Sequence, residues 1–423
     1  MVEVIFMHAV EKILARASNE KRVEAGEIVN AKVDVAMVHD RAGPRVSDSF
    51  EKIGAERVWN PDKVVVTFDH NVPPPTVENA EAQNRFRSFL NRYGLKNVYP
   101  GGTGICHQVL PEKGFAWPGA VIVGTDSHTV TYGAFGAFAT GIGHTEMASV
   151  LALGEIWLRV PRAVRIEVAG RLPLGVMAKD VVLRLAKDVG EEGALYNVID
   201  FVGPTIRGMS VDGRMVFCNM SVEMGAKAGF VEADRKTLDY VQTRTGKTFA
   251  PVKTDPEYDY EREWRLGVGK LEPQVALPHS VANVKPVSEV GDVRVDQALI
   301  GTCTGGRLED LRAAARVLKG RRVSPDTRLV VVPASLEVYL QALEEGLVET
   351  LLHSGAIVCP PGCGPCTGGH MGVLASGEVC VSAANRNFRG RMGSLDSFLY
   401  LASPATVAAS AVEGRIADPR KYI

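Results

Sequence analysis

Cysteines are the residues of this sequence whose spacing points most directly to chemistry. Three of them stand in CPPGCGPCTGG at 359–369, and another follows an apolar run in GTCTGG at 301–306. Thiolates bind zinc and iron, and a C-x-x-C pair can also act in redox chemistry. Spacing alone leaves three interpretations open: a closed zinc site with Cys359 as fourth ligand, a redox pair, or an iron-sulfur cluster on three cysteines with one iron lacking a protein ligand. The redox interpretation is the weakest, because prolines flank the pair and the expected helix start is missing.

Histidines near carboxylates form a second set. TFDHN at 67–71, GICHQ at 104–108 and GTDSHT at 124–129 each place a His close to the end of an apolar run, two of them near an Asp. A carboxylate fixes the imidazole tautomer and raises its basicity, as a general acid near neutral pH requires. These three motifs therefore indicate a catalytic role for their histidines. A structural role is expected for the other histidines: His8, His39, His144, His279, His353 and His370.

Strands and helices must position these cysteines and histidines, and the sequence pattern predicts that the two kinds of element alternate. β-Branched runs predict strands within 63–69, 119–128, 162–170, 295–304 and 326–335, and helical periodicity marks 309–320 and 335–355. The pattern predicts an α/β protein whose chemistry gathers beyond the carboxyl ends of its strands. The polar, proline-containing segment 250–287 predicts a connection between domains, and a second break is expected near 157–164.

Composition excludes several classes of protein. The 423 residues are 46% hydrophobic, enough for two to four packed domains. Lys and Arg number 48 against 49 Asp and Glu, so no nucleic-acid or membrane-surface partner is expected. The chain has no apolar run of about 20 residues and its start carries charges throughout, which predicts a cytoplasmic protein. The odd count of seven cysteines argues against a disulfide framework.

Long ordered stretches resemble the aconitase superfamily, in particular the large subunits of its two-chain isopropylmalate dehydratase and homoaconitase type. The resemblance extends over nearly the whole chain and rests on the segments 25–40, 68–75, 102–108, 124–148, 218–229, 301–321 and 363–393. It implies three α/β domains, at 1–161, 162–280 and 281–423, that converge on one 4Fe-4S cluster. The implied ligands are Cys303, Cys363 and Cys366, with one iron free of cysteine, and Cys106, Cys218, Cys359 and Cys380 are implied to be spectators.

The same resemblance implies a hydro-lyase that removes water from a 2-hydroxy acid. An open iron would act as Lewis acid on the substrate hydroxyl while a positioned acid protonates the leaving oxygen. The implied acid is His70 with Asp69 as its partner. The further implied pairs and lining residues are His107 with Asp126, His128 with Glu223, and Ser127 and Asn219. Each pair has a simpler alternative, a buried salt bridge that holds domains together.

ANRNFRGR at 384–391 suits a di- or tricarboxylate substrate, because Arg binds carboxylates through a planar fork. The resemblance implies that Asn385 and Arg386 lie beside the cluster and that Arg391 binds substrate, whereas Arg389 is expected to face solvent. One departure is evident: many members have Asn two residues after the first cluster cysteine, where this chain has Gly305. This departure puts the fine positioning of the substrate in doubt.

The sequence contains no Ser-Arg dipeptide, whereas single-chain aconitases carry a Gly-Ser-Ser-Arg motif on a swivelling domain. The resemblance therefore implies a separate small subunit, in a heterodimer or heterotetramer, that supplies the swivel domain and the serine base. The leading hypothesis is the large subunit of an isopropylmalate dehydratase in leucine biosynthesis, with homoaconitate or another alkylmalate as the alternative substrate. A nucleic-acid-binding relative and a zinc-stabilised α/β enzyme are weaker hypotheses.

Overall fold

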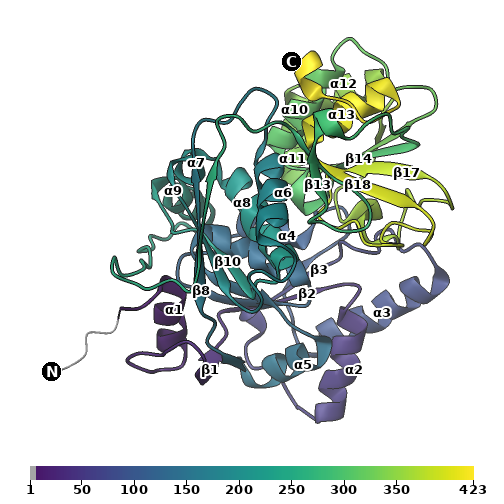
Figure 1. The fold of residues 1–423 in the computed structure, drawn as a ribbon. Coiled ribbons are helices and arrows are strands. Elements are labelled where there is room, and N and C mark those ends of the chain that lie inside the picture. The colour runs from purple at the N-terminus through teal and green to yellow at the C-terminus, as the bar shows by residue number, and fades with distance from the viewer. Residues whose placement is uncertain (1–5) are drawn as a thin grey trace.

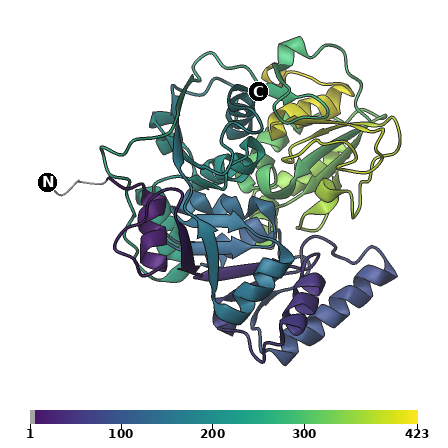
Figure 2. The same cartoon turned by 60° about the horizontal axis from the view of Figure 1, so that its bottom comes forward.

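Three large sheets succeed one another along the chain in the computed structural model, which describes residues 6–423 (Figure 1). The first sheet lies within residues 35–141, the second within 163–267 and the third within 274–402. Figures 1 and 2 show the purple and blue first part, the teal second part and the green to yellow third part around a common centre. The predicted α/β class is confirmed.

The first sheet is parallel and has the strand order β4-β3-β2-β5-β6. Its strands are β2 (Val35–His39), β3 (Val64–Thr67), β4 (Asn97–Tyr99), β5 (Val121–Gly124) and β6 (Phe138–Gly141). Its helical segments are η1 (Pro61–Lys63), α2 (Gly43–Ile53), α3 (Val77–Arg92), α4 (Cys106–Glu112), η2 (Ser127–Phe135) and α5 (His144–Leu153). The chain builds outward from β2 in one direction and from β5 in the other, so the carboxyl ends of these two strands flank a crevice.

Two short strands and a helix attach beside this sheet. Helix α1 (Ala9–Ala17) precedes β1 (Ile28–Lys32), which pairs antiparallel with β7 (Glu155–Arg159). The side chain of His8 accepts the Val10 N–H and caps α1, in agreement with the structural role expected for that histidine.

The second sheet is also parallel, with the order β10-β9-β8-β11. Its strands are β8 (Ala163–Ala169), β9 (Val198–Val202), β10 (Ala228–Phe230) and β11 (Glu263–Gly267). Its helical segments are α6 (Ala178–Val189), α7 (Pro204–Gly208), α8 (Val211–Met220), η3 (Ser221–Met224) and α9 (Arg235–Thr245). Helices α6 and α8 lie on the side toward the centre of the molecule (Figure 1).

The third sheet is mixed and has the order β13-β12-β18-β17-β14-β15-β16, in which only the pairings of β12 are antiparallel. Its strands are β12 (Gln274–Ala276), β13 (Val284–Pro286), β14 (Gln297–Gly301), β15 (Arg328–Val332), β16 (Ile357–Val358), β17 (Val379–Ser382) and β18 (Phe398–Ala402). Its helical segments are η4 (Val287–Glu289), η5 (Thr302–Thr304), α10 (Leu308–Leu318), α11 (Leu336–Glu344), α12 (Leu347–Ser354), η6 (Gly364–Thr367), α13 (Pro404–Glu413) and η7 (Pro419–Lys421). The strand order reverses between β14 and β17, so the loops that follow these two strands leave the sheet side by side.

The predicted strands all exist, and the structure differs from the sequence analysis at two places. Helical periodicity over 335–355 corresponds to two helices, α11 and α12, because Gly346 between them has the left-handed φ of 69°. The segment 250–287, predicted as a connection, contains β11, β12 and β13. Strand β11 is an edge strand that alternates between solvent and core, so its sequence is too polar to stand out as a strand.

The division into domains at 1–161, 162–280 and 281–423 stays a prediction. Its first boundary lies between β7 and β8, and its second lies in the loop that joins β12 to β13 of the third sheet. One buried apolar cluster includes Met37, Ile166 and Leu299, which belong to β2, β8 and β14. The three parts therefore share a continuous core. No helix among residues 6–423 is both long and apolar enough to cross a membrane.

The contact between η2 and β10 joins the first part to the second through two glycines. A Cβ added at Gly133 would lie 1.8 Å from the carbonyl oxygen of Gly229, a backbone atom that cannot move aside alone. We expect Gly133→Ala to destabilise the protein by at least about 1–3 kcal/mol, the usual cost of overpacking. Gly208→Ala, where nothing lies within 4 Å of the added Cβ, is the matched control. Denaturant unfolding measures both, and equal midpoints for the two variants would contradict this account.

Candidate active site

The residues singled out in the sequence come together where the loops at the carboxyl ends of the first and third sheets meet. From the first sheet, Asp69 and His70 follow β3, and Asp126 follows β5. From the third sheet, Cys303 follows β14 and Asn385 follows β17. This placement confirms the expectation that the chemistry-bearing residues gather beyond the carboxyl ends of the strands.

Asp126 is shared by three histidines. Its Oδ1 lies 2.9 Å from His107 Nε2 and 3.3 Å from His128 Nδ1, and its Oδ2 lies 3.6 Å from His70 Nε2. The Oδ1 atom also accepts the backbone N–H of His128 at 2.7 Å. Burial alone would raise the pKa of Asp126, but these contacts hold it well below its usual range.

His70 is held between two carboxylates. Its Nδ1 lies 2.8 Å from Asp69 Oδ1, while its Nε2 faces Asp126. Burial favours the neutral imidazole, yet Asp69 and Asp126 outweigh that effect and hold the pKa of His70 well above its usual range. The other oxygen of Asp69 accepts the Cys106 N–H at 2.6 Å, which fixes the carboxylate. This imidazole is therefore protonated near neutral pH and oriented by its neighbours.

A second chain of contacts links the first part of the molecule to the third. His128 Nε2 lies 2.8 Å from Glu223 Oε1, and Arg386 donates from Nε to the same oxygen at 2.7 Å. Burial opposes the negative charge of Glu223, but His128 and Arg386 lower its pKa. Glu223 thereby fixes the direction of the Arg386 side chain.

The three cysteines lie beside these groups and are buried. Cys303 Sγ accepts N–H bonds from the Asn219 and Asn385 amides, both at 3.3 Å, and Cys366 Sγ accepts from Arg391 Nη2 at 3.6 Å. The Cys363 N–H donates to Asp69 O at 2.8 Å and ties the cysteine loop to the first sheet. Donors aimed at the sulfur atoms suit thiolates that ligate a metal cluster.

The donor set fits a cluster better than a single zinc ion. Sulfur ligands of a tetrahedral zinc lie about 3.8 Å apart, since Zn–S bonds of roughly 2.3 Å meet at tetrahedral angles. Among the described residues, no three cysteine sulfurs lie within 4.8 Å of one another. Cys359, the fourth ligand that a zinc site would need, is half-buried and its Sγ lies near Ile357 O.

Gly305 marks the departure from the family pattern, and the structure gives it a steric reason. A Cβ at this position would lie 2.3 Å from the Cβ of Ala383 and 2.9 Å from the Ala383 oxygen. The loop after Cys303 therefore packs directly on the end of β17. An asparagine would not fit here without a shift of that backbone.

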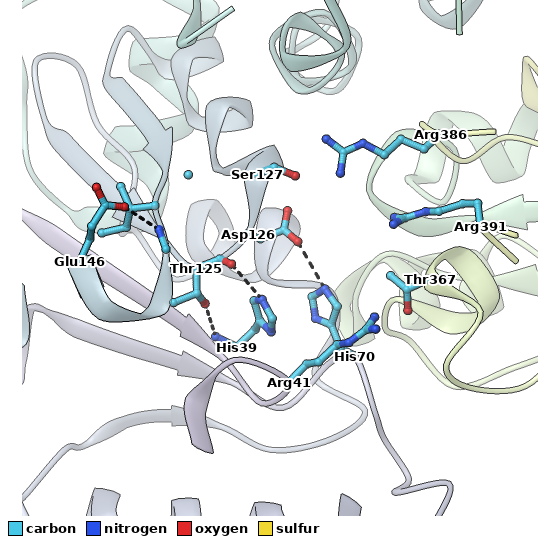
Figure 3. A pocket seen from close by; sticks show the side chains of 13 residues that line it. His39, Arg41, His70, Thr125, Asp126, Ser127, Glu146, Thr367, Arg386 and Arg391 are labelled. Atoms are coloured by element: carbon cyan, nitrogen blue, oxygen red, sulfur yellow. Dashed lines mark hydrogen bonds and ion pairs between the residues drawn. The ribbon is translucent and has the colours of Figure 1, made fainter. Parts of the chain in front are cut away.

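A pocket of about 510 Å³ opens beside this group (Figure 3). His70, Asp126 and Ser127 lie on one wall, and Arg386 and Arg391 extend toward them from the other. The pocket thus places a protonated imidazole opposite two guanidinium groups. All fourteen residues proposed from the sequence lie in or next to this region, and Arg389 is exposed as expected.

His39 is the main site residue that the sequence analysis missed. A structural role is expected for it, but its ring stacks on His70, with centroids 4.1 Å apart, and lines the pocket. Burial and the His70 charge lower the pKa of His39 to about 3, so it is neutral. The adjacent Asp40 accepts backbone N–H bonds from Asp69, His70 and Asn71 and so fixes the loop that follows β3. The available indication was the His-Asp pair that closes the apolar run at 35–38.

Comparison with known families decides the assignment. The aconitase family (aconitate hydratase) matches residues 11–414. The chain belongs to this family. Aconitase-family membership makes the protein a hydro-lyase and implies a 4Fe-4S cluster, in agreement with the geometry around Cys303, Cys363 and Cys366.

Relatives of known name cover almost the full chain. A protein from Methanopyrus kandleri named 3-isopropylmalate dehydratase large subunit 1 is 56% identical, over 98% of this chain and 99% of its own. A probable methanogen homoaconitase large subunit from Methanothermobacter thermautotrophicus is 52% identical, over 99% of each. The crystal structure of aconitase X from Thermococcus kodakaraensis is 14% identical with a TM-score of 0.51, over 92% of this chain and 93% of its own, and supports the fold alone.

The electrostatics of this aconitase-family site predict the protonation of His70. Asp69→Asn removes one of the two carboxylates that hold the imidazole charged, while burial still disfavours the charge, so the pKa of His70 should fall. The ring, protonated at pH 7 in the parent protein, should then be neutral. NMR titration of histidine-labelled protein measures the His70 midpoint in the parent and in the variant. An unchanged His70 midpoint would show that Asp69 does not control this proton.

Proposed function

We propose that this chain is the large subunit of a 3-isopropylmalate dehydratase, which interconverts 2- and 3-isopropylmalate by loss and return of water. The observation that carries the proposal is the pocket in which His70 and Asp126 face Arg386 and Arg391 beside three buried cysteines. The Methanopyrus kandleri relative that bears this name supports the choice of substrate. Dehydration needs an acid for the leaving oxygen and cations for the carboxylates, and the pocket holds both.

Cys303, Cys363 and Cys366 would hold the 4Fe-4S cluster, which supplies Lewis-acid chemistry toward the substrate hydroxyl through an iron that has no cysteine ligand. Asn219 and Asn385 orient the Cys303 sulfur through their amide N–H groups. Asn385 Nδ2 also donates to Asn219 Oδ1 at 3.1 Å, so the two amides are fixed relative to each other.

His70 acts as the general acid in this proposal. Asp69 holds Nδ1, and therefore the proton available to substrate is on Nε2, the atom that faces Asp126 and the pocket. After that proton passes to the departing oxygen, the neutral ring takes up a proton from water, and the two carboxylates favour its return to the charged form. His107 and His128 keep Asp126 in position on the opposite side of its carboxyl group.

Arg386 and Arg391 bind the substrate carboxylates. Glu223 occupies the Nε of Arg386, so the two terminal amino groups of its fork are directed into the pocket (Figure 3). Arg391 contacts Cys366 through one Nη2 bond and lines the same wall. Ser127, at the start of η2, adds a hydroxyl to the wall that faces them.

Abstraction of the α-proton requires a base on the other side of the substrate from the acid. We place that base, a serine on a swivel domain, on a small subunit that closes over the pocket. The absence of the family's Ser-Arg dipeptide from this sequence supports this placement, as does the term large subunit in the names of the relatives. The partner is expected to contact the group attached to the malate backbone.

Homoaconitase is the second candidate function. The Methanothermobacter thermautotrophicus relative with that name covers 99% of this chain at 52% identity. A tricarboxylate would use the same acid and the same two arginines. The two candidates therefore differ in the substrate group that faces the partner.

The experiment combines the purified chain, carrying its cluster, with a small subunit from the same source. We expect no turnover by the chain alone and dehydration of isopropylmalate in the complex, faster than that of homocitrate or citrate. Ultraviolet absorbance of the unsaturated product measures each rate. Turnover by the chain alone would contradict the placement of the base, and a preference for homocitrate would select the second candidate.

The cysteine assignment predicts a set of spectra. Each of the substitutions Cys303→Ser, Cys363→Ser and Cys366→Ser should abolish cluster assembly, because a hydroxyl is a poor ligand for the irons of the cluster compared with thiolate sulfur. Cys359→Ser is the matched control and should leave iron content and the visible spectrum unchanged. Anaerobic reconstitution followed by iron and sulfide analysis measures both. Loss of the cluster in Cys359→Ser, with retention in Cys303→Ser, would reverse the assignment.

A further inference from the structure

A buried lysine lies behind the cysteines and has no part in the chemistry described above. Lys179 is in the first turn of α6, and only 1% of the residue is exposed. The positive charge is disfavoured at this place twice, by burial and by the positive end of the helix dipole. Its presence therefore needs a specific compensation.

The ammonium group uses all three of its donors on the loops of the third sheet. Nζ lies 2.9 Å from Thr304 Oγ1, 3.0 Å from Ala383 O and 2.7 Å from Ala384 O. Thr304 in turn donates to Ala383 O at 2.8 Å. One side chain of the second part of the molecule thus joins the loop after β14 to the loop after β17.

These loops carry the residues that surround Cys303. Thr304 is the next residue after that cysteine, and Ala384 precedes Asn385, whose amide donates to the Cys303 sulfur. The lysine therefore fixes the separation between a proposed ligand and the amide that is hydrogen-bonded to it. Asn387, further along the second loop, is held separately by Leu277 O and Ser280 O.

The charge of Lys179 has no direct carboxylate partner. No carboxylate oxygen of the described residues lies within 4.0 Å of Nζ, although the lysine is buried. Burial lowers the pKa of Lys179 to about 8, while Cys303, Asp310, Cys366 and Glu223 act in the opposite direction. Three thiolates would outweigh the positive charge of a 4Fe-4S core, so a cluster held by Cys303, Cys363 and Cys366 would be anionic and would supply the missing negative charge.

We propose that Lys179 is a positioning residue for the cluster, one that fixes the Cys303 and Asn385 loops and supplies the buried positive charge that offsets the anionic cluster. The inference rests on the proposed function in so far as the three cysteines hold that cluster. Net charge and hydrogen bonding around the sulfur atoms set the reduction potential of such clusters. Loss of the lysine charge should therefore make the cluster harder to reduce.

Two variants of Lys179 separate the effect of its charge from the effect of its hydrogen bonds. Lys179→Met keeps a long apolar stem and removes both, whereas Lys179→Gln removes the charge but keeps two N–H donors on a shorter side chain. Lys236→Gln is the matched control, because Lys236 Nζ also donates to three carbonyls, those of Arg207, Gly208 and Met209, but is exposed and outside the site. Circular dichroism first establishes that each variant folds.

The experiment is a spectroelectrochemical titration of the reconstituted chain, followed by electron paramagnetic resonance. We expect the midpoint potential to shift to more negative values in both Lys179 variants and to stay at the parent value in Lys236→Gln. A folded Lys179→Gln with the parent potential would overturn the proposal, because hydrogen bonds alone would then account for the residue. If Lys179→Met does not fold, Lys179→Gln decides.

The parent protein separates this inference from the proposed function. A parent chain without iron and sulfide would contradict the cluster assignment itself. A parent chain with a cluster, together with an unchanged potential in Lys179→Gln, would contradict only the role of the lysine.

Discussion

The site depends on the contacts that the Asp126 carboxylate makes with three histidines. Three imidazoles, those of His70, His107 and His128, converge on it within 3.6 Å, and each comes from a different segment of the chain. A buried carboxylate is tolerated only when it is paired, and here the pairing also orients the rings. His70 is charged and directed at the pocket because Asp69 and Asp126 both act on it. Removal of Asp126 would leave three histidines without their common partner.

The fold supplies the constraint that makes this convergence possible. The strand order reverses between β2 and β5 in the first sheet and between β14 and β17 in the third, so the loops that follow each of these pairs leave their sheet side by side. A shared apolar core holds the two sheets together. The proposed acid and the proposed carboxylate-binding residues therefore come from opposite sides, the histidines from loops of the first sheet and Arg386 and Arg391 from the loop after β17 of the third. Lys179 of the second part ties the loops after β14 and β17 to α6.

Much of the fold and of the candidate site could be predicted from the sequence, and the features that were missed have physical causes. The strand ends at Asp69, His70 and Asp126 could be predicted because β-branched runs precede these residues. The pairing of His107 with Asp126 and of His128 with Glu223 came from the family resemblance. The contact of His70 with Asp126 depends on how the loops after β3 and β5 meet, which periodicity does not encode. His39 looked structural because stacking on another ring is a tertiary property. Strand β11 was missed because an edge strand needs few apolar residues.

The central claim is that these residues act on one substrate bound at an iron without a cysteine ligand. Mössbauer spectroscopy of the complex, reconstituted with iron-57, tests it most directly when spectra with and without isopropylmalate are compared. The account predicts that the resonance of a single iron changes on substrate binding while the others stay the same. A spectrum in which no iron responds to a substrate that the complex turns over would contradict it.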